Sequence, residues 1–260
     1  MLLTVVLPMI ERAFGAATNV TLLELSDQEN ACLRRLVLEA PGTYHHSVVV
    51  GNLAEAAAER IGANPLLSRV ASYYHDIGKI VKPGYFTEND TGRSRHDDLA
   101  PTISTLIITA HVKDGVEMGR AYELPRAILD IIEQHHGTGK VGFFRRRALE
   151  QADDPDEVPE SAFRYPGPRP RTREAAIVLL ADSVEAASRS LAEPAPAHIE
   201  RLVHRIVSEK LMDGQLDDSP LSFRDLRAIE ESFARTLNAM YHSRVRYPDG
   251  DAPRGRKAAR

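Results

Sequence analysis

The chain has 260 residues, a hydrophobic content of 43% and a formal net charge of -4, so it can bury a large core and has no overall basic field for nucleic acid. Its one cysteine, Cys32, excludes an internal disulfide and a thiolate metal cluster. No apolar run reaches the ~20 residues that span a bilayer.

The first 25 residues are expected to form a segment of their own. They begin with MLLTVVLPMIERAF, which is apolar, too short to span a bilayer and without the basic start of a signal peptide. This composition fits the end of a longer membrane helix and equally an ordinary amphipathic first helix.

The remaining sequence predicts one helix after another. Apolar residues recur at mostly helical spacing from residue 27 to 39, and Pro41-Gly42 ends that helix. The further helices are expected at 43–62, 65–78, 101–122, 125–136, 172–191, 197–212 and 222–245. Residues 82–99 and 151–171 are predicted loops, the second a mobile loop or insertion, and 249–260 a disordered tail. The fold class is therefore all-α, with one domain.

Residue types that bind metals stand at the edges or centres of several apolar helix faces. Taken singly, a histidine is more often a core or surface residue, or a cap at a helix end. An aspartate within IVLLADSVEAA is costly unless it is paired or metal-bound. Helical bundles build metal sites from imidazoles and carboxylates that point inward, and the whole set favours such a site. Its members are His46, His75, Asp76, His111, His135, His136 and Asp182.

The order of these residues resembles the HD-domain metal-dependent phosphohydrolases. Six flanking segments are more specific: APGTYHHS, YYHDIGK, KPGYFTEN, HVKDG, LP…HHGT and DGQLDDSPLSFRDL. Together they are similar to the cytosolic HD domain of the PgpH-type, seven-transmembrane-receptor HD proteins, over residues 7–248. The resemblance implies an HD-domain helical bundle with a dinuclear metal centre at 26–248. It also implies that residues 1–25 are the end of a membrane helix plus a linker.

The resemblance further implies seven metal ligands. One ion is expected on His46, His75, Asp76 and Asp182, and a second on His111, His135 and His136, with Asp76 bridging. Adjacent residues of a helix point ~100° apart, so only one of His45 and His46 is expected to face the site, and the resemblance places the ligand just before Ser47, at His46. Four other histidines match no ligand position and are expected to be surface or structural residues: His96, His198, His204 and His242.

The implied activity is hydrolysis of cyclic di-AMP to 5′-pApA by a hydroxide that two metal ions activate, with Asp76 as a catalytic residue. Imidazole and carboxylate ligands suit Fe, Mn or Zn, and the resemblance favours Fe or Mn. Lys79 is a candidate catalytic and phosphate-binding residue, although it also fits a surface lysine at a helix end. Thr138 is a second candidate substrate contact.

Two other functions stay open: a catalytically silent, nucleotide-sensing HD module, and an HD phosphohydrolase that acts on other nucleotides. A sister group that hydrolyses cyclic di-GMP carries Gly-Tyr-Pro after its second histidine pair, and this chain lacks it there. Tyr85 and Phe86 are candidates either to stack on a base or to pack in the fold. The resemblance places the chain as a cytoplasmic domain of an integral membrane protein, with cyclic di-AMP and not nucleic acid as its ligand.

Overall fold

The computed structural model describes residues 17–89, 92, 94–191 and 195–242. Within these ranges the chain forms ten α-helices and four short 3-10 helices, and the only strand-like pairing is a bridge between Lys140 and Arg164. The all-α prediction is therefore confirmed. Of the segment expected at 1–25, residues 1–16 lie outside the described residues and residues 19–25 form a helix, and the tail expected at 249–260 also lies outside the described residues. None of the described helices has both the length and the apolar content needed to cross a bilayer.

Eight of the ten described α-helices follow the predicted order, whereas the helices at 19–25 and 142–151 were not predicted. The α-helices are α2 (Asn19–Leu25), α3 (Ala31–Glu39), α4 (Pro41–Ile61), α5 (Pro65–Tyr74), α6 (Pro101–Ala121), α7 (Arg126–Gln134), α8 (Gly142–Gln151), α9 (Arg173–Ser188), α10 (Pro196–Met212) and α11 (Phe223–His242). The 3-10 helices are η1 (Ile77–Val81), η2 (Pro83–Tyr85), η3 (Pro155–Glu157) and η4 (Glu160–Phe163).

Local sequence signals explain several helix ends. Proline occupies the first turn of α4, α5, α6 and α10, where its missing N–H costs nothing. The Asn64 side chain caps α5 by accepting a hydrogen bond from the Leu67 N–H at 3.0 Å. Gly62 ends α4 in the left-handed conformation, with φ of 69°.

Two helices end earlier than their apolar pattern predicts. The α-helix α5 stops at Tyr74 and α7 stops at Gln134, so His75-Asp76 and His135-His136 each lie in the turn just beyond a helix. After the first pair the chain continues as η1, and after the second Gly137 takes a positive φ of 54°. These turns aim both members of a pair at one site, which a continuing helix would not do.

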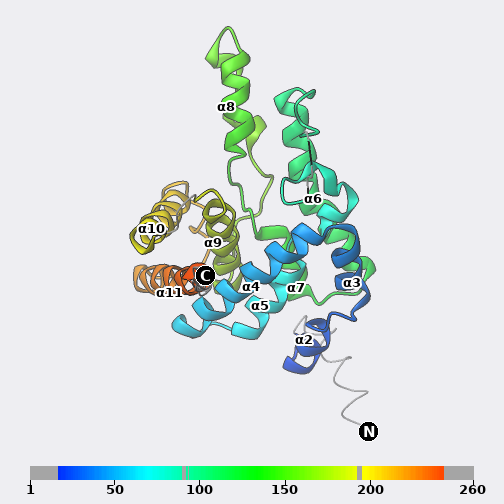
Figure 1. Ribbon diagram of the computed structural model, residues 1–260, viewed down its shortest axis with the longest axis vertical. Coiled ribbons are helices and arrows are strands. Elements are labelled where there is room, and N and C mark those ends of the chain that lie inside the picture. Colours follow the sequence, from blue (N-terminus) through cyan, green and yellow to red (C-terminus); the bar gives the residue numbers. More distant parts are fainter. Residues whose placement is uncertain (1–16, 90–91, 93, 192–194, 243–260) are drawn as a thin grey trace, which may run out of the picture.

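Helix α9 forms the centre of the core. All residues from 175 to 182 are buried, as expected for a helix that is apolar around its whole circumference. Helices α4, α5, α7, α10 and α11 pack around it, and α8 and one end of α6 extend from this body on the same side (Figure 1). The buried start of α9 thus holds Asp182 inside the bundle.

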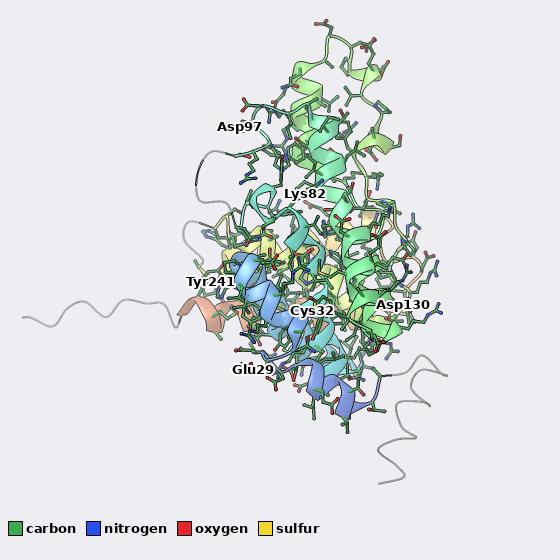
Figure 2. The ribbon with its side chains drawn as sticks, turned by 90° about the vertical axis from the view of Figure 1, so that its right-hand side faces the viewer. Glu29, Cys32, Lys82, Asp97, Asp130 and Tyr241 are labelled. Atoms are coloured by element: carbon green, nitrogen blue, oxygen red, sulfur yellow. The ribbon has the colours of Figure 1, made fainter. Side chains whose placement is uncertain are left out.

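The segment 151–171 differs from the expected mobile loop. Phe163 is only 1% exposed, and its carbonyl accepts a hydrogen bond from Val141 N–H at 2.8 Å. Arg164 donates hydrogen bonds to both carboxylate oxygens of Asp213 and to Glu160. These ion pairs, called the Arg164 clamp below, fix the segment 151–171 to the helical body. The side chains of this region and of the loop around Asp97 are drawn in Figure 2, where Cys32 lies in the body away from Asp97.

Candidate metal centre

The structure brings all seven predicted ligands together. They come from five parts of the fold that are distant in sequence: α4, the turn after α5, α6, the turn after α7, and α9. Their ligand atoms form two groups, within each of which all atoms lie within 4.8 Å of one another. The first group is His46, His75, Asp76 and Asp182, and the second is Asp76, His111, His135 and His136.

The first group is almost completely buried. His46 Nε2 lies 3.0 Å from Asp182 Oδ1 and 3.6 Å from Asp76 Oδ2. His75 Nε2 lies 3.2 Å from the same Asp76 oxygen and 3.8 Å from Asp182 Oδ1. Two imidazole nitrogens and two carboxylate oxygens therefore surround one point.

The second group uses the other oxygen of Asp76. His111 Nε2 and His135 Nε2 lie 3.2 Å and 3.5 Å from Asp76 Oδ1. His136 completes this group, and its Nδ1 also lies 3.5 Å from Asp182 Oδ2. The two oxygens of Asp76 thus face different groups, which is the geometry that a bridging carboxylate needs.

Hydrogen bonds at the outer ring nitrogens orient the imidazoles. The Nδ1 atoms of His75, His111 and His135 lie 2.7, 2.6 and 2.7 Å from the carbonyl oxygens of Ser72, Ile108 and Ile132. Because a carbonyl can only accept, each Nδ1 carries a proton, and Nε2 is the ring nitrogen left to face a cation. Such outer partners fix the tautomer and raise the basicity of a metal-binding histidine.

His46 is oriented by a carboxylate. Its Nδ1 lies 2.5 Å from Glu185 Oε2, and Arg189 Nε lies 3.2 Å from the same oxygen. Sequence analysis missed Glu185, although it stands three residues after Asp182 and therefore on the same helix face. This carboxylate–histidine pair is the usual support of a metal ligand.

The polar atoms at the centre fit divalent cations. The two oxygens of Asp76 and the Nε2 of His75 are buried and have no hydrogen-bond partner of correct geometry, although Lys79 Nζ approaches Asp76 Oδ2 to 2.7 Å. Buried polar atoms normally find partners, and several acceptors aimed at one point need a cation to satisfy them. The site thus suits divalent metal binding.

Burial and neighbouring charges shift the pKa values of three of the predicted ligands in different directions. Burial alone would raise the pKa of Asp76, but His75 and Lys79 hold it well below its usual range. Burial lowers the pKa of His135 to about 4, so its imidazole is neutral at pH 7. Burial alone would lower the pKa of His75, but the neighbouring carboxylates of Asp76 and Asp182 raise it to about 10. The same carboxylates that attract this proton would attract a metal ion.

Lys79 is held beside the centre by two carboxylates. Its Nζ lies 2.7 Å from Asp76 Oδ2 and 2.7 Å from Glu88 Oε1, and Glu88 also accepts a hydrogen bond from Thr43 Oγ1 at 3.1 Å. Burial opposes the charge on Lys79, but both carboxylates raise its pKa, so the ammonium persists. Lys79 therefore supports the orientation of Asp76, and its contact with phosphate stays a prediction.

Thr138 is engaged within the protein. Gln215 Oε1 accepts from the Thr138 N–H at 2.8 Å, and Gln215 Nε2 donates to Thr138 Oγ1 at 3.1 Å. Gln215 is fully buried and also donates to Asp213 at 2.8 Å. These bonds fasten the turn after His136 to the end of α10. The predicted substrate contact of Thr138 remains open, with its donors already in use.

Tyr165 is a second residue that sequence analysis missed. Its ring stacks on His136 with centroids 4.1 Å apart and an interplanar angle of 28°. Burial is the main cause of a raised pKa of this phenol, and the charges of Lys79 and Asp182 also act on it. The residue lies in the Pro-rich segment after α8, where no periodic pattern marks a side chain that faces the site.

The other histidines and the aromatic pair have structural or surface positions. His45 is exposed, as expected beside the inward-facing His46. His96 is buried and bonds the Tyr85 carbonyl at 2.9 Å. His204 pairs with Glu230 at 3.2 Å on the surface, His198 is exposed, and the side chain of His242 lies outside the described ones.

The candidate base-stacking residues pack in the fold. The Tyr85 ring meets the His96 ring edge-on at 5.3 Å. Phe86 is buried and meets His111 edge-on at 5.6 Å. Of the two open roles, the structure favours packing.

Comparison with known proteins agrees with this geometry. The family model described as the HD domain matches residues 43–187. Over 94% of its length the chain is 48% identical to the cyclic-di-AMP phosphodiesterase PgpH of Bacillus subtilis (strain 168) and 44% identical to that of Listeria monocytogenes serotype 1/2a. It spans 34% of the length of each of these relatives.

Two solved structures of the L. monocytogenes PgpH HD domain resemble the fold. One covers 82% of this chain and 100% of the solved chain, with 43% identity and a TM-score of 0.77. The other, a complex with cyclic-di-AMP, covers 83% and 99%, with 44% identity and a TM-score of 0.78. The resemblance found in the sequence is confirmed: the chain belongs to the HD-domain family, and its HD domain is of the PgpH type.

Proposed function

We propose that this domain is a metal-dependent phosphodiesterase that hydrolyses cyclic di-AMP to 5′-pApA. The observation that carries the proposal is the pair of ligand groups that share Asp76. The names of the PgpH relatives and the solved complex with cyclic-di-AMP support the choice of substrate.

The proposed centre holds two transition-metal ions, Fe or Mn. One would bind His46, His75, Asp76 and Asp182, and the other His111, His135, His136 and Asp76. Two such ions supply charge stabilisation for the attacking and leaving oxygens of an in-line displacement and make a bound water acidic. The imidazole-rich second group favours Fe or Mn over Mg, which prefers oxygen ligands. Elemental analysis of purified protein tests both number and identity.

The residues of the chain fix the geometry of the reaction. Asp76 is held between the two groups by its charge partners, and Lys79, whose Nζ lies 2.7 Å from Asp76 Oδ2, is the proposed contact of a phosphate oxygen. Positioned groups of this kind remove ordering entropy from the chemical step and stabilise developing charge. After ring opening the linear product is more flexible, so release competes with a second cleavage.

A time course with Mn-loaded protein and cyclic di-AMP, followed by chromatography, tests the reaction. We expect 5′-pApA to accumulate as the main product. AMP as the main product from the earliest points, or faster hydrolysis of cyclic di-GMP, would contradict the substrate assignment. Binding without turnover would indicate a nucleotide-sensing module, and preferred hydrolysis of mononucleotides a different HD phosphohydrolase.

We also propose that the domain works as the cytoplasmic part of a membrane-anchored protein, with helices preceding residue 26. The sequence resemblance to the PgpH type supports this context. Fractionation of cells with an antibody against the domain tests it: the full-length protein should sediment with membranes and resist extraction by high salt.

A further inference from the structure

Lys210 stands close to the candidate centre but belongs to neither ligand group. It lies in the last turn of α10, and its Nζ is 3.6 Å from the position that a Cβ would take on Gly139. Among carboxylates, Asp182 acts most strongly on its charge. Lys210 thus approaches the centre from α10, whereas Lys79 approaches it from η1.

The carboxylates around Lys210 are engaged with other groups. Asp213 binds Arg164 through both oxygens, at 2.8 and 3.2 Å. Glu209 lies 3.7 Å from Arg205, and the oxygens of Asp182 face the imidazoles. Within the part of the chain that the structure describes, Lys210 therefore forms no ion pair of its own.

The surroundings of the Lys210 ammonium favour the binding of an anion. Lys210 is partly buried, and burial lowers the pKa of its ammonium because the surrounding carboxylates compensate only in part. A cation that loses water without gaining a counter-ion costs free energy, and a bound anion recovers that cost. Phosphate oxygens are strong acceptors for such a group.

Lys210 also lines a pocket that is separate from the metal ligands. This pocket has a volume of about 500 Å³ and is lined by Lys140, Gly142, Glu209, Lys210, Met212 and Asp213. Its size is that of a small-molecule site. Met212 is 85% exposed and offers an apolar surface at the rim.

We infer that Lys210 binds the second phosphate of the substrate, the one that is not being hydrolysed, and that the adjoining pocket takes the nucleoside attached to it. This inference rests on the proposed function, because a cyclic dinucleotide carries two phosphates. The ligand groups and Lys79 gather around one phosphate position. Lys210 lines the pocket and also lies beside Gly139, three residues after the ligand His136, and these two observations are the basis for assigning the second phosphate to it.

The test compares Lys210→Ala, Lys210→Arg and the control Arg201→Ala, which removes an exposed cation from the same helix. With Mn-loaded protein, Lys210→Ala should raise KM for cyclic di-AMP by at least about tenfold, the effect of losing one charged hydrogen bond. Its kcat and metal content should stay within about twofold of the unchanged protein. Lys210→Arg should recover most of the affinity, and Arg201→Ala should change nothing.

Two further measurements separate binding from folding and from chemistry. Hydrolysis of bis(p-nitrophenyl) phosphate, which has one phosphate only, should be unaffected by Lys210→Ala. The dissociation constant of the bis-phosphorothioate analogue of cyclic di-AMP, which resists hydrolysis, should rise at least about tenfold by calorimetry.

The possible failures are distinct. If the unchanged protein neither binds nor hydrolyses cyclic di-AMP, the proposed function and this inference both fail. If it does both and Lys210→Ala has an unchanged KM and dissociation constant, only the role of Lys210 is overturned. If Lys210→Ala lost activity on bis(p-nitrophenyl) phosphate to the same extent as on cyclic di-AMP, Lys210 would contact the hydrolysed phosphate instead. If Lys210→Ala lost its bound metal and Lys210→Arg did not restore it, the role of Lys210 would be structural.

Discussion

Asp76 connects the two ligand groups because each of its oxygens faces different histidines. Replacing it with alanine leaves two sets of ligands without their shared anion. Removal of a residue that only hydrogen-bonds to a metal ligand lowers metal affinity or activity about 10–100-fold. Loss of Asp76, which is itself a predicted ligand, should therefore lower them more than about 100-fold. We expect Asp76→Ala to lose most of its bound metal and its phosphodiesterase activity, as measured by elemental analysis and product chromatography.

The control for this prediction is His204→Ala, a change at a surface histidine that lies outside both groups. It should keep full metal content and rate. An Asp76→Ala protein with full metal content would show that Asp76 does not bridge two ions.

Glu185 acts on the centre only through His46, whose Nδ1 it holds at 2.5 Å. Glu185→Ala should lower metal affinity about 10–100-fold, because His46 then loses its fixed orientation. Glu185→Gln keeps an acceptor oxygen at the same place and should lose less. Titration of the metal-free proteins with Mn²⁺ measures both affinities. Equal affinities for the unchanged protein, Glu185→Ala and Glu185→Gln would exclude a positioning role of Glu185.

At the scale of elements, η1 and α6 are packed backbone to backbone at Gly78. A Cβ on Gly78 would lie 1.9 Å from the His111 carbonyl oxygen and 2.5 Å from Gly115 N, and backbone atoms cannot yield as side chains do. Gly78→Ala must therefore push η1 and α6 apart, which separates Asp76 from His111. We expect a loss of about 1–3 kcal/mol in the free energy of unfolding, typical of overpacking, together with a large loss of activity.

Gly142→Ala is the matched control, because a Cβ there meets nothing within 4 Å. Denaturant unfolding should show the stability of Gly142→Ala unchanged. If Gly78→Ala were as stable and active as the original protein, the close approach of η1 to α6 would not be needed for the site.

At the scale of the whole molecule, the core shields Cys32, which is 0% exposed. Burial raises the pKa of its thiol to about 12, well above the ~8.5 of a free thiol. In the folded protein the thiolate is therefore absent at pH 8, and a thiol reagent should react only after the core opens. The labelling rate should follow the unfolding transition in urea, and rapid labelling without urea would contradict this packing.

The same shift predicts a loss of stability in alkali. Between about pH 9 and pH 12 the unfolded chain releases the thiol proton and the folded chain keeps it, so the free energy of unfolding falls as pH rises. Burial also raises the pKa of Tyr74, with the same sign. Cys32→Ala should therefore reduce the alkaline loss without abolishing it, which chemical unfolding at pH 8 and pH 10.5 measures; an unchanged slope would exclude the thiol as a contributor.

The sequence alone predicted the all-α class, eight of the ten described α-helices and the seven candidate ligands, but it did not predict α2 or α8. Apolar periodicity and proline and glycine positions carry the first two, because they act within a few residues. Asp182 was noticeable because it interrupts an apolar helix, and His75-Asp76 and His135-His136 because they follow apolar helices, but the assignment of the seven ligands came from the family resemblance. Helix geometry showed that only one of His45 and His46 could face the site, and the resemblance indicated His46.

Only the tertiary structure decided which groups support these ligands. Glu185, Tyr165 and Gln215 act through contacts with residues 139, 29 and 77 positions away, and no local pattern carries such information. The same holds for the segment 151–171, whose composition predicts a loop but whose Arg164 clamp depends on Asp213. Helix periodicity is a property of neighbouring residues, whereas hydrogen bonds between helices depend on how the whole chain packs.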